Sequence, residues 1–290
     1  MDTLRTLQTV DGVTLGYRLR RGGATPRPLL VLLHGMASNM TRWSEFIEHT
    51  TLKESWDILC PDLRGHGKSF TRARLDMDNW CRDLLTLLDT EGGDRAVLVG
   101  HSLGAQVAVH FAARYPTRLR GLVLIDPVLH QALRGTMRAV NLARPVIRAF
   151  VYVILFLNRL GLRRRRIPDR DLRKMDEATR AKLLQAGKQE EMIELYSSPW
   201  EDVKFFPVGS YLREMLEIVR PLPSLAQIET PILVLLSKGI TYTDPEITRA
   251  VLAENPRIQT VTIDAYHWPL TEKPVQVRAA IEAWCTKNWG

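Results

Sequence analysis

The chain has 290 residues, 45% of them hydrophobic and 25% charged, which is an ordinary globular composition able to bury a sizeable core. Its three cysteines, Cys60, Cys81 and Cys285, are odd in number and widely spaced. Such cysteines make a poor disulfide framework, and no pair of them has the spacing of metal ligands. The net charge of +8 is concentrated between Arg134 and Lys174, where twelve Lys or Arg residues accompany two acids.

The predicted elements begin with a hairpin, because residues 6–20 alternate apolar and polar side chains around Asp11-Gly12. Short apolar runs that indicate buried strands then alternate with helical patterns. We predict strands at 29–33, 57–60, 96–99, 122–125, 232–236 and 260–263, and helices at 77–90, 103–114, 246–254 and 274–286. This order predicts an α/β fold with a mostly parallel sheet flanked by helices, with ligands bound beyond the carboxyl ends of the strands.

One stretch, from about residue 128 to 225, has no convincing strand. A structureless loop of that length is uncommon in a compact domain, so several helices inserted after the sixth strand are the better interpretation. We therefore predict a core domain of residues 1–127 and 226–290 and a helical cap, or lid, of residues 128–225.

The cap contains an apolar run, Ala149–Leu157, bordered by Arg148 and Arg159 and followed by Arg163–Arg166. Nine residues are too few to span a bilayer, which needs roughly 20. Three interpretations are open: a helix buried against the sheet domain, a helix that lines an acyl-chain pocket, or an interfacial helix on anionic lipid. Nucleic acid is not an expected partner, because neither an aromatic platform nor a reading motif accompanies the arginines.

The strongest local motif is Gly100-His101-Ser102-Leu103-Gly104, which follows one predicted strand and opens a helix. A serine at such a sharp turn has a strained backbone and an exposed hydroxyl, and the two glycines relieve crowding by neighbouring backbone. We therefore predict Ser102 as a nucleophile. It needs an adjacent base, and His267, in the loop between the last strand and the last helix, is the best candidate.

Acyl transfer also needs hydrogen-bond donors for an oxyanion. The N–H of Leu103, next to the nucleophile, is one candidate. The N–H of Met36 is the other, because His34-Gly35-Met36 follows an earlier strand and Gly35 allows close approach of the backbone. His34 is better explained as a structural loop residue than as a second base.

Four motifs in this order resemble the α/β-hydrolase superfamily: His34-Gly-Met, the segment Asp62–Ser69, Gly100-His-Ser-Leu-Gly, and His267-Trp-Pro-Leu-Thr. The resemblance covers nearly the whole chain outside the cap. It implies the α/β-hydrolase fold, a Ser–acid–His triad and an oxyanion hole formed by two N–H groups, at Met36 and Leu103. It also implies that Asp62–Ser69 is mostly structural.

The position of the triad acid in this sequence departs from the family pattern. The family usually places an Asp a few residues after the seventh strand, but Ser237 to Thr243 contains none and Asp244 comes late. Some members place it directly after the sixth strand, where this chain has Asp126. Asp126 is preferred and Asp244 is the alternative; either would orient His267 and stabilise its imidazolium.

The resemblance implies a serine hydrolase that cleaves carboxylic esters through an acyl-enzyme, such as a carboxylesterase or a monoacylglycerol- or lysophospholipid-type lipase. Thioesterases, lactonases and carbon–carbon bond hydrolases share the triad, and a non-catalytic ligand-binding or membrane-associated protein of this fold is the alternative from another class. We expect a small ester with an apolar acyl group, neither metal nor organic cofactor, and pocket positions at His34, Trp43, His101 and Trp268.

The start of the chain lacks the apolar core of a signal peptide, so a cytoplasmic location, possibly peripheral to a membrane, is expected.

Overall fold

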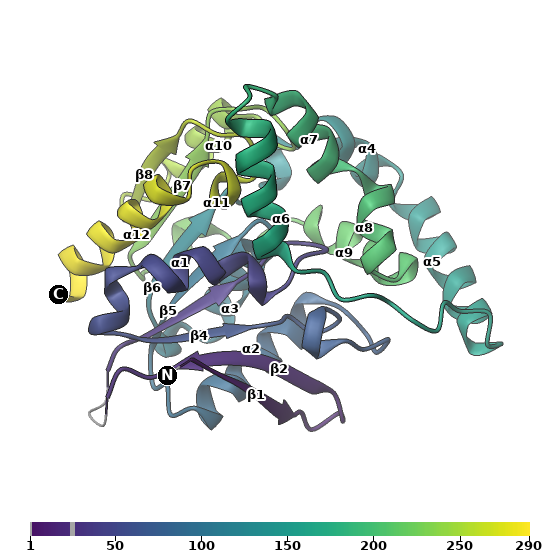
Figure 1. The fold of residues 1–290 in the computed structure, drawn as a ribbon, viewed down its shortest axis with the longest axis horizontal. Helices are drawn as coiled ribbons and strands as arrows, with labels where there is room; N and C mark the ends of the chain where they lie inside the picture. The colour runs from purple at the N-terminus through teal and green to yellow at the C-terminus, as the bar shows by residue number, and fades with distance from the viewer. Residues whose placement is uncertain (1, 24–26) are drawn as a thin grey trace.

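An eight-stranded sheet forms the centre of the computed structural model, which describes residues 2–23 and 27–290 (Figure 1). The strand order is β1-β2-β4-β3-β5-β6-β7-β8; β2 is antiparallel to β1 and β4, and the other neighbours are parallel. The predicted mostly parallel sheet is confirmed. The strands are β1 (Asp2–Gln8), β2 (Thr14–Arg20), β3 (Leu29–Leu33), β4 (Asp57–Pro61), β5 (Ala96–His101), β6 (Leu119–Ile125), β7 (Ile232–Ser237) and β8 (Ile258–Ile263).

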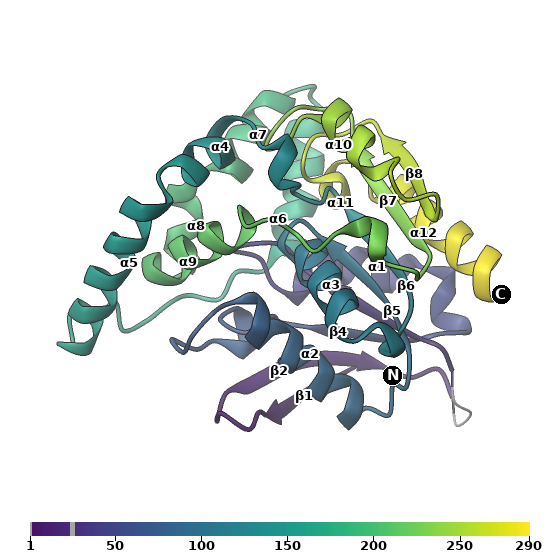
Figure 2. The same cartoon turned by 180° about the vertical axis from the view of Figure 1, so that it is seen from behind.

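Helices cover both faces of the sheet, because its inner strands are apolar on both sides (Figures 1 and 2). Alternate residues of β3 belong to different apolar clusters, as the period of two in a strand requires. Leu29, Val31 and Leu33 are in the cluster that includes α2 (Met77–Thr90) and α3 (Leu103–Arg114). Leu30 and Leu32 are in the cluster that includes α1 (Ser44–His49) and α12 (Pro274–Trp289).

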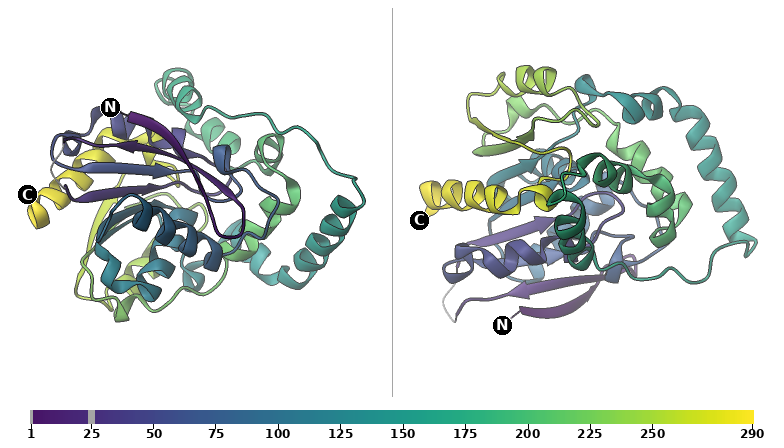
Figure 3. Two further views of the ribbon diagram at one scale, coloured as in Figure 1. Left: turned by 90° about the horizontal axis from the view of Figure 1, so that it is seen from below. Right: turned by 45° about the horizontal axis from the view of Figure 1, so that its top comes forward.

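Between β6 and β7 the chain forms successive helices beyond the carboxyl ends of the strands (Figures 1 and 3). They are α4 (Gly135–Leu142), α5 (Arg144–Arg159), α6 (Leu172–Thr179), α7 (Gln189–Ser197), α8 (Pro199–Phe205) and α9 (Val208–Ile218). An isolated antiparallel bridge, Leu133 to Thr243, joins this stretch to the segment before α10 (Pro245–Leu252). The segment is helical as expected, and its status as a separate cap domain stays a prediction.

The apolar run in α5 is largely exposed, so the interpretation of a helix buried against the sheet domain is wrong. Phe150, Val153 and Phe156 are 61%, 54% and 60% exposed, and Val151 is the buried residue of this helix. In the described part of the chain, no single helix is long and apolar enough to cross a membrane. The bent pair α4–α5 meets that test jointly by length and composition, with 76° between its two helices.

Candidate active site

Ser102 lies at the strand–helix turn between β5 and α3. Its φ of 51° and ψ of −110° place it in a backbone region that non-glycine residues rarely adopt. Two backbone hydrogen bonds hold this conformation, because the Ser102 N–H donates to Ile125 O at 3.0 Å and the Gln106 N–H donates to Ser102 O at 3.1 Å. The turn therefore projects the hydroxyl beyond the sheet.

The two glycines of the motif are required by close backbone contacts. A Cβ on Gly100 would lie 2.3 Å from the carbonyl carbon of Gly104, and a Cβ on Gly104 would lie 2.4 Å from Leu33 O. Because these neighbours are backbone atoms, a side chain at either position forces the turn or β3 to move. The predicted crowding is confirmed.

His267 reaches Ser102 from the loop between β8 and α11 (Pro269–Glu272). Its Nε2 lies 2.9 Å from Ser102 Oγ, a distance at which an unprotonated Nε2 can accept the hydroxyl proton. The Nε2–H of His101 donates to the backbone oxygen of His267 at 2.8 Å, and the carboxylate of Glu272 accepts the N–H of Tyr266. These bonds fix the loop that carries the imidazole. Burial, and secondarily His101, holds the pKa of His267 well below its usual value.

Asp126 directly follows β6 and faces the other side of the same ring. Its Oδ2 lies 3.8 Å from His267 Nδ1. The carboxylate is held by Ser237 at the end of β7, whose N–H donates to Oδ1 at 2.7 Å and whose hydroxyl donates to Oδ2 at 2.5 Å. Burial raises the pKa of Asp126 to about 7, although the two Ser237 hydrogen bonds oppose the increase.

The alternative acid, Asp244, is engaged elsewhere. It caps α10 by accepting the N–H groups of Glu246 and Ile247 at 3.0 and 3.1 Å, and it accepts a 2.6 Å hydrogen bond from Arg134. The structure thus brings Asp126, and not Asp244, to His267.

The candidate oxyanion donors approach Ser102 from two segments. Leu103 begins α3, so its N–H has no partner within the helix. Gly35 and Met36 line the cavity at Ser102, and a Cβ on Gly35 would lie 3.5 Å from Ser102 Cβ. The chain after β3 therefore runs close against the nucleophile turn, where its N–H groups can face a substrate oxygen.

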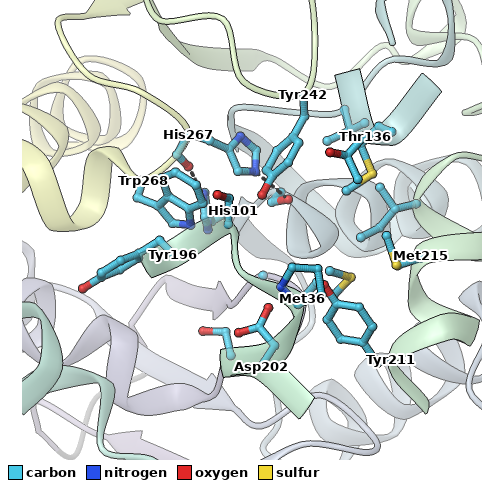
Figure 4. A pocket seen from close by; sticks show the side chains of 18 of the residues that line it. Met36, His101, Thr136, Tyr196, Asp202, Tyr211, Met215, Tyr242, His267 and Trp268 are labelled. Atoms are coloured by element: carbon cyan, nitrogen blue, oxygen red, sulfur yellow. Dashed lines mark hydrogen bonds between the residues drawn. The ribbon is translucent and has the colours of Figure 1, made fainter. Parts of the chain in front are cut away.

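A narrow cavity of about 70 Å³ opens at Ser102 (Figure 4). Tyr196, Tyr242 and Trp268 gather around His267, while Met36, Tyr211 and Met215 face them across the cavity. The helices between β6 and β7 supply much of this lining: Thr136, Met137, Tyr196, Ser197, Pro199, Asp202, Tyr211, Met215 and Ile218. α5 supplies none of the residues that line it, so the interpretation of α5 as an acyl-pocket wall is also wrong.

Both charged residues of the lining have partners. Arg42 pairs with Asp176 and donates to Thr271 Oγ1 at 2.8 Å. Asp202 accepts a 3.0 Å hydrogen bond from Arg170. The cavity therefore offers no unpaired charge to a substrate.

Of the four expected pocket residues, His101 and Trp268 line the cavity and His34 and Trp43 do not. His34 is fully buried, with Nδ1 2.8 Å from Gly35 O and Nε2 accepting the N–H of Leu63 at 3.0 Å. Trp43 is also fully buried and packs edge-to-face on Phe46. Their assignment to the pocket is wrong, whereas the structural interpretation of His34 is confirmed.

Sequence reasoning missed Ser237 and the tyrosines of the lining. A signal for Ser237 existed, because parallel pairing of Ile125 with Leu235 places the residues after both at one sheet edge. Tyr196 and Tyr211 had no such signal, since their positions depend on how helices far along the chain pack over Ser102.

The eight-stranded sheet and the Ser102–His267 contact at its carboxyl edge are features of a hydrolase fold. Residues 30–280 match the model of the alpha/beta hydrolase family, and the chain belongs to this family.

Individual relatives either match a smaller part of the chain than the family model does or match the whole chain at low sequence identity. Lipase LipV of Mycobacterium tuberculosis is 36% identical over 122 residues, which are 42% of this chain and 45% of LipV. A 2-hydroxy-6-oxononadienedioate/2-hydroxy-6-oxononatrienedioate hydrolase of Burkholderia vietnamiensis is 37% identical over 40% of this chain and 41% of its own length. The chain thus matches less than half of each of these relatives. A thermophilic esterase of Thermogutta terrifontis shares the fold with a TM-score of 0.68 over all of both chains, at 24% identity.

Proposed function

We propose that this protein hydrolyses carboxylic esters through an acyl-enzyme formed on Ser102. The observation that carries the proposal is the 2.9 Å contact between Ser102 Oγ and His267 Nε2 at the floor of a cavity. A serine hydroxyl is a poor nucleophile alone, and an imidazole at this distance can accept its proton. Membership of the alpha/beta hydrolase family supports the same chemistry.

The reaction proceeds in two halves. His267 takes the Ser102 proton as Oγ attacks the ester carbonyl, and the N–H groups of Met36 and Leu103 stabilise the resulting oxyanion. His267 then protonates the leaving alcohol, which departs and leaves the acyl-enzyme. A water molecule gives its proton to His267 and attacks the acyl carbon; the acid is released and Ser102 recovers its proton.

In this proposal Asp126 is the acid that fixes the His267 tautomer with Nδ1–H toward the carboxylate and stabilises the imidazolium. Its 3.8 Å separation from Nδ1 suits a substrate-free site, because catalytic hydrogen bonds often tighten only in the substrate complex.

The substrate is a neutral ester with a small acyl or alcohol group. The lining charges are already paired, and about 70 Å³ is well below the ~300 Å³ at which typical ligand pockets begin. A long acyl chain, as in a monoacylglycerol, enters only if α4, α8 or α9 moves away from Ser102.

A fluorophosphonate probe and p-nitrophenyl esters of increasing acyl length test the proposal. The probe should label Ser102, and Ser102→Ala and His267→Ala should abolish both labelling and turnover. The value of kcat/KM should be highest for short acyl chains. Met215→Ala, which enlarges the cavity, should shift the optimum to longer chains, whereas Met77→Ala, at a buried methionine of α2 outside the lining, should not. Absence of labelling by a folded protein would refute the proposal.

A further inference from the structure

One face of α5 presents a continuous apolar band to solvent. Val146, Phe150, Val153 and Leu157 follow the helical spacing i, i+4, i+7, i+11, and Leu160 continues it just beyond the helix. Four of these five residues are 54% to 62% exposed, and Leu157 is 37% exposed. Phe156, three residues after Val153 and therefore beside it on the helix, is 60% exposed. We call these six residues the α5 apolar face.

The opposite side of α5 fixes the helix to its neighbours. Val151 is buried, and Ile154 packs closely on α9, since a Cβ on Gly209 would lie 3.1 Å from Ile154 Cγ2. The helix is therefore held by one side, and α5 lies at the outer edge of the molecule, away from the sheet (Figures 2 and 3).

Arginines lie at both ends of the apolar run and directly after α5. Within the described residues, no ion pair to an acid involves Arg148, Arg159 or any residue of the run 163–166. Their positive potential reaches Arg72, whose pKa is lowered by burial and further by Arg163 and Arg164. Apolar side chains and uncompensated positive charge thus occupy one edge of the molecule.

We propose that α5 docks this protein on the surface of an anionic lipid bilayer. Aromatic and aliphatic side chains beside arginines match the boundary between acyl chains and anionic headgroups. The two kinds of side chain have separate tasks: the α5 apolar face enters the acyl boundary, and the arginines contact the headgroups.

A second copy of the chain fits this surface less well. Symmetric pairing through α5 would bring the arginines of both copies together, and like charges destabilise such a contact. Exposed apolar side chains bordered by one sign of charge therefore favour lipid over self-association.

Docking would place the bilayer beside helices that cover Ser102. α9, which contacts α5, carries Tyr211 and Met215 of the cavity lining, and α4, directly before α5, carries Thr136 and Met137. The docking surface and the cavity nevertheless share no residue, so binding to lipid can be measured independently of hydrolysis.

Co-sedimentation of the full chain with phosphatidylcholine vesicles, with and without phosphatidylglycerol, tests the proposal at low and high salt. We expect binding that requires phosphatidylglycerol and weakens with salt. The variant Phe150→Ser/Phe156→Ser should lose binding, and its thermal unfolding should stay unchanged because both side chains are exposed. Arg163→Gln/Arg165→Gln/Arg166→Gln should bind on the order of 100-fold more weakly, because each basic residue near an anionic surface contributes a factor of roughly 5.

The matched control is Arg120→Gln/Arg249→Gln/Arg257→Gln, which removes the same charge from exposed positions outside α5 and should bind as the parent does. Ser102→Ala should also bind normally, which separates this surface from the proposed active site. Two outcomes would overturn the proposal: no vesicle binding by the folded parent, or self-association that Phe150→Ser/Phe156→Ser abolishes without any vesicle binding.

Discussion

The Oδ2 atom of Asp126 lies 3.8 Å from Nδ1 of His267, beyond hydrogen-bonding distance but close enough to stabilise an imidazolium. The same carboxylate is anchored by Ser237, which belongs to the neighbouring strand. A buried acid with a fixed orientation thus lies behind the proposed base.

The first prediction separates the two candidate acids. Asp126→Asn should lower kcat by on the order of 10⁴, by analogy with the triad of serine proteases, because an amide favours the wrong His267 tautomer. Asp244→Asn should leave turnover close to that of the parent, since Asp244 caps α10 and pairs with Arg134. Steady-state kinetics on one p-nitrophenyl ester compares them; full turnover by Asp126→Asn would show that another group is the acid.

The second prediction concerns pH. The pKa of Asp126 is raised to about 7 by burial, while that of His267 is well below its usual value. The imidazole is therefore already neutral when Asp126 ionises, and kcat/KM should rise as pH increases through about 7. Ser237→Ala removes a hydrogen bond that lowers the Asp126 pKa. The midpoint of the rise in kcat/KM should therefore move to higher pH by on the order of one unit.

The control for this change is Ser237→Thr, which keeps a hydroxyl and should keep the pH midpoint of the parent. If Ser237→Ala also shows the parent's midpoint for the rise in kcat/KM, the assignment of that rise to Asp126 is contradicted.

Folding stability gives a third prediction. A carboxyl group whose pKa is raised in the folded state keeps its proton there, while the unfolded chain loses it near pH 4, so stability falls as pH rises from about 4 to 7. Asp126→Asn removes the free-energy cost of ionising this buried carboxyl group. The variant should therefore be more stable than the parent by a few kcal/mol at pH 8, with little gain at pH 4. Urea unfolding at the two pH values measures the difference; an equal effect at both would exclude ionisation as the cause.

The sequence predicted the parts of this molecule that depend on local patterns. β3 begins and ends where its apolar run does, at Leu29 and Leu33, because a strand buried on both faces is apolar throughout. β6 begins at Leu119, three residues before the predicted start at Leu122. The prediction started late because the exposed Arg120 interrupts the apolar pattern of the strand. Ser102 and its glycines were predictable for the same local reason: the turn itself demands them.

The parts that depend on packing between distant segments were not predictable. An apolar run indicates that α5 is a helix, but not whether another element covers Phe150 and Phe156. Tyr211 and Met215 reach the cavity through the placement of α9 over the sheet, for which the chain carries no local motif. Trp43 shows the opposite error, because an aromatic residue in an expected loop proved to be core.

Glu214 and His66 form a fully buried pair next to the loop that carries Met36. The His66 Nε2 lies 3.2 Å from Glu214 Oε2, and its Nδ1 lies 3.2 Å from Leu63 O, so both ring nitrogens face acceptors, which favours the protonated imidazole. Burial alone would lower the pKa of His66, but the Glu214 carboxylate raises it. Glu214 Oε2 also accepts the N–H of Ala37 at 3.4 Å, and Ala37 has a φ of 47°.

The fourth prediction is that Glu214, which lies on α9, holds the loop that carries Met36 in position. Glu214→Gln leaves His66 without an anion, so the free energy of unfolding should fall by roughly 3–5 kcal/mol at pH 6. The loss should shrink as pH rises, because a raised histidine pKa stabilises the fold only while the ring is protonated.

The Ala37 contact adds a kinetic readout to this stability change. If Glu214 holds the backbone beside Met36, Glu214→Gln should lower kcat more than it raises KM, since the oxyanion forms only during the reaction. Glu201→Gln on α8, partly exposed and paired with Lys204, is the matched control and should change neither stability nor kcat. A Glu214→Gln protein that is destabilised but retains the parent's kcat would limit Glu214 to holding the fold, and Met36 would then owe its position to β3 and Gly35 alone.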